Sequence, residues 1–248
     1  ELRSHTSELF ERDLIENVNE DGMARSDCFK LTEYAKSDLL SELNLNIKTK
    51  SDYNLIKSDS LPEKKLIYNL SEQKQVEELS VILSSDRFSE VQSRLRNAGM
   101  RTGFCSLFYG SPGTGKTETV YQIARATGRD ILRVDVDKIK SCWVGESEQN
   151  IKKLFDRYRN ICKDSTLAPI LLFNEADAIL GIRMEGATRA VDKMENSIQN
   201  IILQEMEALD GIMIATTNLT TNLDKAFERR FLYKIQFNRP TVEARAAI

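Results

Sequence analysis

The sequence has few of the residues that build metal sites and disulfide frameworks. Its 248 residues include one histidine, His5, and four cysteines, none of which forms a CxxC pair. A zinc site is therefore not expected, and cysteines used in this way are typical of a reducing compartment, so we expect a cytoplasmic protein. Apolar runs are short too, and none has the length that crosses a membrane.

A strong excess of charge is also missing. The net charge is −3, with 41% hydrophobic and 29% charged residues, which is ordinary for a globular protein. A weakly acidic chain does not favour a broad nucleic-acid-binding surface. The sequence starts at Glu1, without an initiating Met or a signal-peptide pattern, so we interpret it as a fragment of a longer protein.

From about residue 100 onward, apolar strands alternate with amphipathic helices. Helical periodicity marks 115–128, 147–162 and a long segment through Met206. Strands connected by helices predict an α/β fold with a parallel five-stranded sheet, and ligands of such sheets bind beyond the carboxyl ends of the strands. The five predicted strands are 105–110, 131–136, 169–176, 211–218 and 233–237.

The first quarter of the chain has a weaker pattern. Residues 1–65 predict a small helical or irregular extension, and its last part, 57–65, is polar, contains Pro62 and is typical of a linker. We expect the nucleotide-binding α/β domain to cover 66–239, beginning with helices between 71 and 99.

The most specific motif is GSPGTGKT at 110–117, which fits GxxxxGK[ST] between a predicted strand and a predicted helix. Its glycines let backbone N–H groups face phosphate oxygens, and the helix directs its positive end at the same anions. Lys116 adds a cation and Thr117 a hydroxyl for Mg²⁺, so the motif predicts a bound nucleoside triphosphate. The predicted binding residues are Gly110, Ser111, Pro112, Gly113, Thr114, Gly115, Lys116, Thr117, Glu118 and Asn174.

A second motif, ILLFNEAD at 170–177, ends a buried strand in polar residues. Glu175 is the candidate that orients and deprotonates an attacking water, because in-line attack on a γ-phosphate needs a positioned proton acceptor. The alternative for Glu175 is a charge at the start of a helix.

Five motifs in this order, GSPGTGKT, SCWVGESE, LLFNEAD, IATTN and AFERRF, resemble the AAA+ ATPase superfamily. The nearer resemblance is to AAA-type bacterial ATP-binding proteins with an aromatic pore loop, and it covers about 66–248. It implies a P-loop NTPase fold, ATP and Mg²⁺ as cofactors, and ATP hydrolysis. It also implies a homo-oligomeric ring, a hexamer in the full-length protein, that remodels or threads a protein substrate.

The resemblance assigns further residues. Asn218 corresponds to a polar sensor of the γ-phosphate or of its attacking water, although an Asn that closes a strand into a turn is also common. Arg229 or Arg230 corresponds to an arginine finger that reaches the neighbouring subunit's ATP. A solvated basic pair is the alternative for the two arginines. The stretch Trp143, Val144 and Gly145 corresponds to the pore loop, although a lone Trp is also a common core residue.

Asn174 stands where the family usually carries Asp. An amide keeps one oxygen acceptor but loses the charge, which predicts weaker second-shell support of Mg²⁺ and a slow ATPase. Asp177 is a candidate for partial compensation, and a purely structural Asn174 is the alternative. The segment 240–248 resembles the start of the family's helical lid, most of which would follow Ile248.

Three other functions compete with protein remodelling. A nucleotide-dependent assembly switch with little turnover would suit Asn174. A DNA-associated AAA+ ATPase is disfavoured by the acidic net charge and by Trp143, since a protein that tracks a phosphate backbone has a basic lining. A small-molecule kinase would need neither the FERRF segment nor a pore loop. We therefore expect protein partners, with no nucleic acid and no membrane.

Overall fold

The structure is a computed structural model that describes residues 7–12, 14–19, 24–32, 55–136, 147–182, 190–220 and 222–247. The chain divides into two units, Glu1–Asp52 and Tyr53–Ile248. The described residues 55–65, which were assigned to the extension from the sequence, lie in the second unit.

The described part of the first unit is mainly a β-hairpin. A short helix, α1 (Glu8–Glu11), precedes two antiparallel strands, β1 (Ile15–Asn19) and β2 (Ala24–Leu31). The sequence predicted a helical or irregular extension, and in the described part the helix is confined to α1. The missed signal is the Asp-Gly pair at 21–22 between two runs with β propensity, a pattern typical of hairpins.

The second unit is built on a six-stranded sheet with the order β3-β5-β6-β7-β4-β8. Neighbours among the last five strands pair in parallel, which confirms the predicted parallel sheet, while β3 pairs antiparallel with the start of β5. A two-residue strand has no readable periodicity, so β3 was not predicted. The strands are β3 (Leu55–Ile56), β4 (Phe104–Gly110), β5 (Ile131–Asp135), β6 (Ile170–Asn174), β7 (Ile212–Thr217) and β8 (Tyr233–Phe237).

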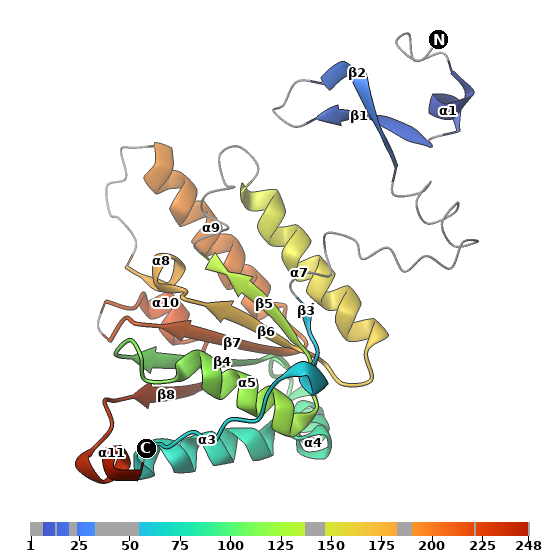
Figure 1. Ribbon diagram of the computed structural model, residues 1–248. Coiled ribbons are helices and arrows are strands. Elements are labelled where there is room, and N and C mark those ends of the chain that lie inside the picture. The colour runs from blue at the N-terminus through green and yellow to red at the C-terminus, as the bar shows by residue number, and fades with distance from the viewer. Residues whose placement is uncertain are drawn as a thin grey trace. The chain divides into compact units, whose positions relative to one another are not determined.

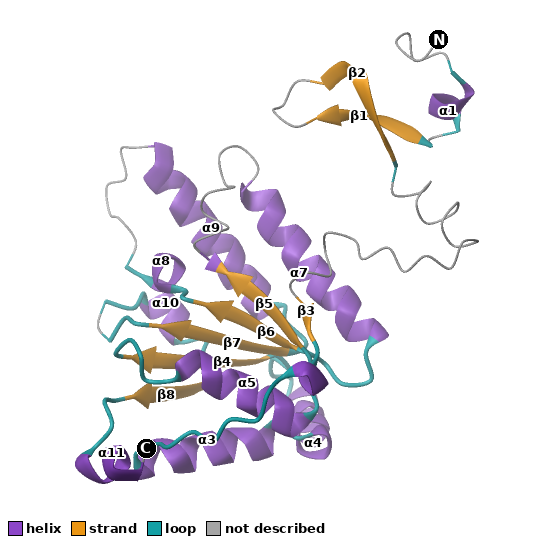
Figure 2. Cartoon of the chain, viewed as in Figure 1, coloured by secondary structure: helices purple, strands orange, loops and turns teal. Residues whose placement is uncertain are grey.

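Helices cover both faces of this sheet (Figures 1 and 2). On one face lie α3 (Leu70–Ile82), α4 (Ser85–Asn97) and α5 (Lys116–Thr127); on the other lie α7 (Ser147–Asp164), α8 (Asp177–Leu180), α9 (Ala190–Glu207) and α10 (Lys225–Glu228). A short 3-10 helix, η2 (Ser58–Ser60), and a final helix, α11 (Val242–Ala247), complete the described elements. Because helices pack on both faces, the central strands are apolar almost without interruption.

The core consequently has two halves, one on each face of the sheet. Phe108 and Phe237 pack together on the α5 face, and Phe155 packs against Phe173 on the α7 face. Burying side chains of this size contributes about 1.5–3 kcal/mol each to folding. These packed layers fix the carboxyl ends of β4, β6 and β7, which carry the polar motifs.

The segment 57–65, predicted to be a linker, lies against α5. Lys57 forms an ion pair with Asp130 at 2.7 Å, and Lys64 forms one with Glu118 at 2.9 Å. Leu61 is buried beside the same face of the sheet. Within the described ranges, no helix combines the length and the apolar character needed to span a membrane.

Candidate nucleotide-binding site

The loop 110–115 forms a tight turn between β4 and α5. Gly110, Gly113 and Gly115 have φ values of +138°, +75° and +86°, a left-handed range that favours glycine. Thr114 closes the turn by donating its hydroxyl to the Ser111 carbonyl at 2.9 Å. The loop therefore delivers the first, positively polarised turn of α5 to the edge of the sheet.

Lys116, the first residue of α5, folds back over this loop. Its Nζ donates to the carbonyl oxygens of Gly110 at 2.9 Å and of Ser111 at 2.8 Å, and the residue is only 7% exposed. Burial lowers the pKa of its ammonium group, and the nearby Asp177 carboxylate partly opposes that effect. A buried cation whose hydrogen bonds within the described residues go to two carbonyl oxygens is suited to receive an anion.

Asn174 lies at the end of β6, directly opposite Thr117. The Thr117 hydroxyl donates to Asn174 Oδ1 at 2.8 Å, and the Thr216 hydroxyl of β7 donates to the same oxygen at 3.3 Å. Asn174 is 6% exposed. The amide oxygen thus joins the first turn of α5 to two neighbouring strands.

Glu175 follows immediately and has an unusual backbone. Its φ is +54°, in the left-handed region that a non-glycine residue rarely adopts, and its side chain is exposed. The Glu175 N–H donates to the Thr216 hydroxyl at 3.1 Å. Thr216 therefore fixes the turn that points Glu175 away from the core.

Asp177 holds Asn218 in place at the end of β7. Its carboxylate accepts the Asn218 backbone N–H at 2.7 Å and the Asn218 side-chain amide at 3.3 Å, and it also accepts the Thr217 hydroxyl. These bonds fix the Asn218 side chain. Asp177 begins α8 and does not continue β6, and its hydrogen bonds within the described residues go to Thr217 and Asn218.

Part of this set lines a pocket of about 350 Å³, which we call the loop pocket; Gly110, Ser111 and Asn174 adjoin its lining residues and do not line it themselves. It brings together most of the predicted phosphate-binding residues with Glu175 and Asn218. Glu118, also predicted, lines the pocket while it pairs with Lys64. The lining residues are Pro112, Gly113, Thr114, Gly115, Lys116, Thr117, Glu118, Tyr121, Arg133, Glu175, Thr216, Thr217 and Asn218.

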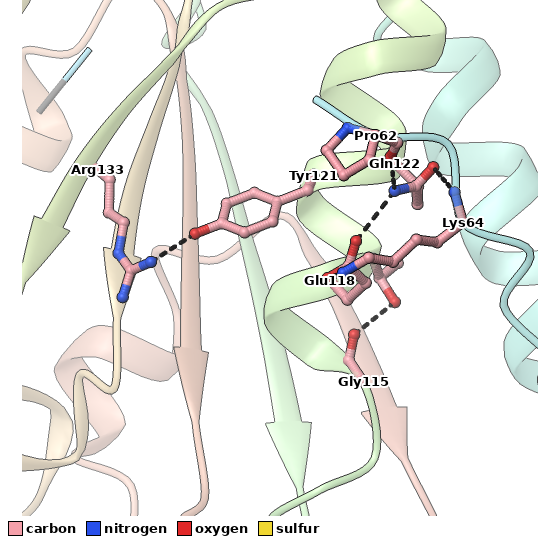
Figure 3. A network of polar contacts seen from close by, with 8 residues as sticks. Pro62, Lys64, Gly115, Glu118, Tyr121, Gln122 and Arg133 are labelled. Atoms are coloured by element: carbon pink, nitrogen blue, oxygen red, sulfur yellow. Dashed lines mark hydrogen bonds and ion pairs between the residues drawn. The ribbon is translucent and has the colours of Figure 1, made fainter. Parts of the chain in front are cut away.

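Tyr121 and Arg133 form a wall of the loop pocket that the sequence did not predict. Figure 3 shows the Tyr121 ring of α5 reaching Arg133 of β5, where the guanidinium Nη1 donates to the phenol oxygen at 2.6 Å. Burial lowers the pKa of Arg133, but the bonds and charges of Asp135 and Tyr121 outweigh it and raise the pKa overall. The wall is therefore cationic.

A second pocket of about 300 Å³ lies across the same loop; we call it the Tyr68 pocket. It shares Gly113, Thr114 and Gly115 with the loop pocket and is otherwise lined by 65–69, Glu72, Asn238 and Pro240. The buried Glu72 carboxylate accepts the backbone N–H of Asn238 at 2.8 Å and the side-chain amide of Asn69 at 2.9 Å. The signal for this network was the N-x-x-E pattern at 69–72, a capping-box sequence.

The two predicted finger arginines lie outside both pockets and differ from each other. Arg230 is tied down: its guanidinium donates to the Ala226 carbonyl at 2.8 Å and pairs with Glu207. Arg229 is exposed, and its side chain makes no ion pair with any described residue. The predicted pore loop, Trp143, Val144 and Gly145, lies outside the described residues.

The residues at the loop pocket fit a Mg²⁺ ion that arrives with a nucleotide. Thr117 and Asn174 offer neutral oxygens 2.8 Å apart, and hard oxygen ligands are what Mg²⁺ prefers. In the part of the chain that the structure describes, no three His, Cys, Asp or Glu residues form a metal cluster. Such a site suits a metal held mainly by phosphates and water, with few protein ligands.

Comparison with known proteins shows which proteins this chain resembles. Residues 106–239 match the family model for the ATPase family associated with various cellular activities (AAA). Cell division protein C of Sulfolobus acidocaldarius is 31% identical over 149 residues, which cover 57% of this chain and 38% of that protein. The 26S proteasome regulatory subunit 7 homolog of Schizosaccharomyces pombe is 31% identical over 151 residues, 57% of this chain and 32% of that one.

Among solved structures, the FIGL-1 AAA domain shares the fold with a TM-score of 0.57. It is 18% identical and the alignment covers 79% of this chain and 61% of the FIGL-1 chain. The matches to the two curated proteins above span well under half of either protein's length.

Proposed function

The chain belongs to the AAA family of ATPases, and from that premise we propose that it binds ATP at the loop pocket and hydrolyses it as part of a protein-remodelling ring. The observation that carries the proposal is that the loop pocket joins Lys116, Glu175 and Asn218 in one cavity. Cation, proton acceptor and polar sensor are the groups that in-line phosphoryl transfer to water requires.

Binding starts at the loop. We infer that the phosphate oxygens accept hydrogen bonds from the backbone N–H groups of 113–117. The phosphates also attract Lys116 Nζ away from the carbonyl oxygens of Gly110 and Ser111, to which it now donates. The base then occupies the Tyr68 pocket, since the loop 113–115 lines both cavities. Mg²⁺, carried by the phosphates next to Thr117 and Asn174, would neutralise phosphate charge.

The hydrolytic step is assigned to Glu175 and Asn218. Glu175 accepts a proton from the attacking water, and its position depends on the bond from its N–H to Thr216. Asn218, fixed by Asp177, orients that water through its amide oxygen, which accepts an O–H, or orients the terminal phosphate through the second N–H of its amide, which donates to a phosphate oxygen. Of the two arginines, Arg229 is exposed and therefore the better candidate to reach a neighbouring subunit's nucleotide.

The proposal extends to assembly and substrate. It comprises a homo-oligomeric ring, hexameric in the full-length protein, a protein substrate gripped by Trp143, and the cytoplasmic location expected from the sequence. Its support is the family membership together with relatives such as a proteasome regulatory subunit.

The first experiment measures ATP binding and turnover separately. Lys116→Ala should abolish both, whereas Glu175→Gln should keep ATP bound and reduce turnover by about 10²–10⁴-fold, the usual contribution of a general base. Equal turnover in wild type and Glu175→Gln would refute the assignment of Glu175.

A second experiment tests the ring. Arg229→Ala should bind ATP normally but lose the rise of specific activity with protein concentration, while keeping the wild-type melting temperature. Arg230→Ala should lower the melting temperature, because it removes the ion pair with Glu207, which keeps only Arg101 as a partner, and the bond to the Ala226 carbonyl. Concentration-dependent turnover that survives Arg229→Ala and fails only in a well-folded Arg230→Ala protein would reverse the assignment.

One specific observation favours a second function, an assembly switch with little turnover. Asn174 offers a neutral oxygen that already accepts two hydroxyl groups, so it adds no charge near the metal position. This function predicts ATP-dependent assembly with turnover at the level of Glu175→Gln. Wild-type turnover well above Glu175→Gln would exclude it.

A further inference from the structure

The charged residues that line the loop pocket include one that the proposed hydrolysis does not use. Four charged side chains line it: Lys116 and Arg133 are cations, and Glu118 and Glu175 are anions. Glu118 is already paired with Lys64 at 2.9 Å and Arg133 with Asp135 at 2.8 Å, and the residue at 174 is a neutral amide. The pocket therefore carries more positive charge than it would with a carboxylate at 174.

Arg133 is held in this wall by two elements. Its Nε donates to Asp135 at 2.8 Å, two residues along β5, and its Nη1 donates to the Tyr121 hydroxyl at 2.6 Å. Tyr121 belongs to α5, the helix that begins at Lys116, so the guanidinium is fixed relative to the phosphate loop (Figure 3). These are its hydrogen bonds within the described residues, and Nη2 remains available to a ligand.

The register of the sheet places this pair beside the altered position. In the parallel pair of β5 and β6, Asp135 lies opposite Asn174. Arg133 lies opposite Leu172, two residues before Asn174 on β6. Alternate residues of a strand share a face, so Arg133, Asp135 and Asn174 all face α5. The side chain of Arg133 is 36% exposed, which leaves part of the guanidinium in contact with the pocket.

We propose that Arg133 is a second phosphate-binding cation, and that with Lys116 it lets this site hold ATP in the absence of a divalent metal. The proposal rests on the proposed function, because it takes the loop pocket as the ATP site. The N–H donors of a guanidinium group match the spacing of phosphate oxygens. Its positive charge neutralises part of the negative phosphate charge that a bound metal would otherwise neutralise. In this proposal Asn174 weakens the binding of the metal, and Arg133 replaces part of the positive charge that the metal would supply.

The test compares nucleotide affinities with and without metal. Fluorescent ATP and ADP analogues are titrated into the chain in Mg²⁺ and in EDTA, for wild type, Arg133→Gln, Arg133→Lys and Arg101→Gln. Arg101→Gln is the matched control, since it removes the same charge from an exposed pair with Glu207, and Arg101 does not line the loop pocket. Thermal melting establishes that each variant is folded.

Wild type should bind ATP in EDTA within about tenfold of its affinity in Mg²⁺. Arg133→Gln should lose about 10- to 100-fold of its ATP affinity in EDTA, the value of one charge-assisted contact to phosphate, and clearly less in Mg²⁺. ADP should be affected less than ATP in both buffers. Arg133→Lys should recover part of the loss, and Arg101→Gln should match wild type.

Two results would overturn the proposal while leaving ATP binding intact. One is an Arg133→Gln protein that binds ATP in EDTA as wild type does; if its turnover falls, Arg133 acts on Glu175 and not on phosphate. The other is an equal loss for ATP and ADP in both buffers, which would mean that Arg133 only stabilises the wall. A folded wild type that binds no nucleotide in either buffer would refute the proposed function itself, and this proposal with it.

Discussion

Replacing Asn174 by Asp tests how the site handles its metal. Asn174 is buried and its Oδ1 accepts the Thr117 hydroxyl at 2.8 Å and the Thr216 hydroxyl at 3.3 Å. The Asp carboxylate has the same shape as the Asn amide and keeps both hydrogen bonds. It adds one negative charge 2.8 Å from the Thr117 hydroxyl oxygen. We expect the substitution to raise the affinity for Mg²⁺ with bound ATP and to raise turnover.

The magnitude follows from two opposing effects. A carboxylate that supports a metal ligand is worth about 10–100-fold in metal affinity or activity, or about 1.4–2.8 kcal/mol. Against this, the ligand-free protein must bury a charge whose hydroxyl partners satisfy only part of it, at a cost of about 1–3 kcal/mol. Asn174→Asp should therefore be less stable than wild type without ligand and recover stability with Mg²⁺ and ATP.

The assay titrates Mg²⁺ at fixed ATP and records bound nucleotide, turnover and melting temperature. Asn222→Asp is the control, since Asn222 is an exposed turn residue that lines neither pocket and undergoes the same chemical change. The reasoning is refuted if Asn174→Asp has the Mg²⁺ dependence and turnover of wild type. A lower turnover would mean that the amide, and not a carboxylate, is needed there.

Three further predictions concern the elements around the site. Thr216→Val removes the hydroxyl that joins Asn174 to the Glu175 N–H. Turnover should therefore fall by about tenfold or more, while ATP affinity stays within a few-fold of wild type. A parallel loss of turnover and ATP affinity would contradict a role through Glu175. Gly110→Ala places a methyl group against the Phe237 carbonyl at a residue with φ +138°. It should lower the free energy of unfolding in urea by more than 2 kcal/mol, about twice the cost of the control Gly99→Ala, where φ is +66° and the space is open. Similar losses of unfolding free energy in the two variants would contradict the clash. Burial raises the pKa of Cys105 from its ordinary value of 9.0 to about 12, so the stabilising contribution of the buried neutral thiol is complete below pH 9 and declines toward pH 12. Between pH 8 and pH 10.5 the free energy of unfolding in urea should therefore fall by about 2 kcal/mol more for wild type than for Cys105→Ala. An identical fall in both proteins would contradict this burial effect.

Much of the α/β unit could be predicted because its signals are local and repeated. Each parallel strand is a continuous apolar run bounded by polar residues, and GSPGTGKT carries its geometry in glycines. The position of Glu175 beside the loop followed from the rule that carboxyl ends of parallel strands meet at the same edge, whereas Asn218 was assigned from the resemblance to the AAA+ superfamily.

The remaining features depend on pairings that the sequence does not display. Tyr121 and Arg133 are twelve residues apart, and their contact exists only because α5 packs over β5. Asp177 was a candidate for partial compensation of Asn174, but the chain turns at Glu175, and the Asp177 carboxylate accepts the backbone N–H and the side-chain amide of Asn218. The hairpin at 15–31 was missed because its alternation is weak and its turn signal is short.

The contacts of the segment 57–65 have a mechanical consequence. Lys57 bonds to Asp130 just beyond the end of α5, Glu63 to Arg125, and Lys64 to Glu118, one turn from the phosphate loop. The segment 57–65 is therefore fastened along the length of α5, and β3, which comes directly before it, pairs with the start of β5. A tension applied to the chain at Leu55 therefore acts on β5 and on α5, the helix that begins at the phosphate loop.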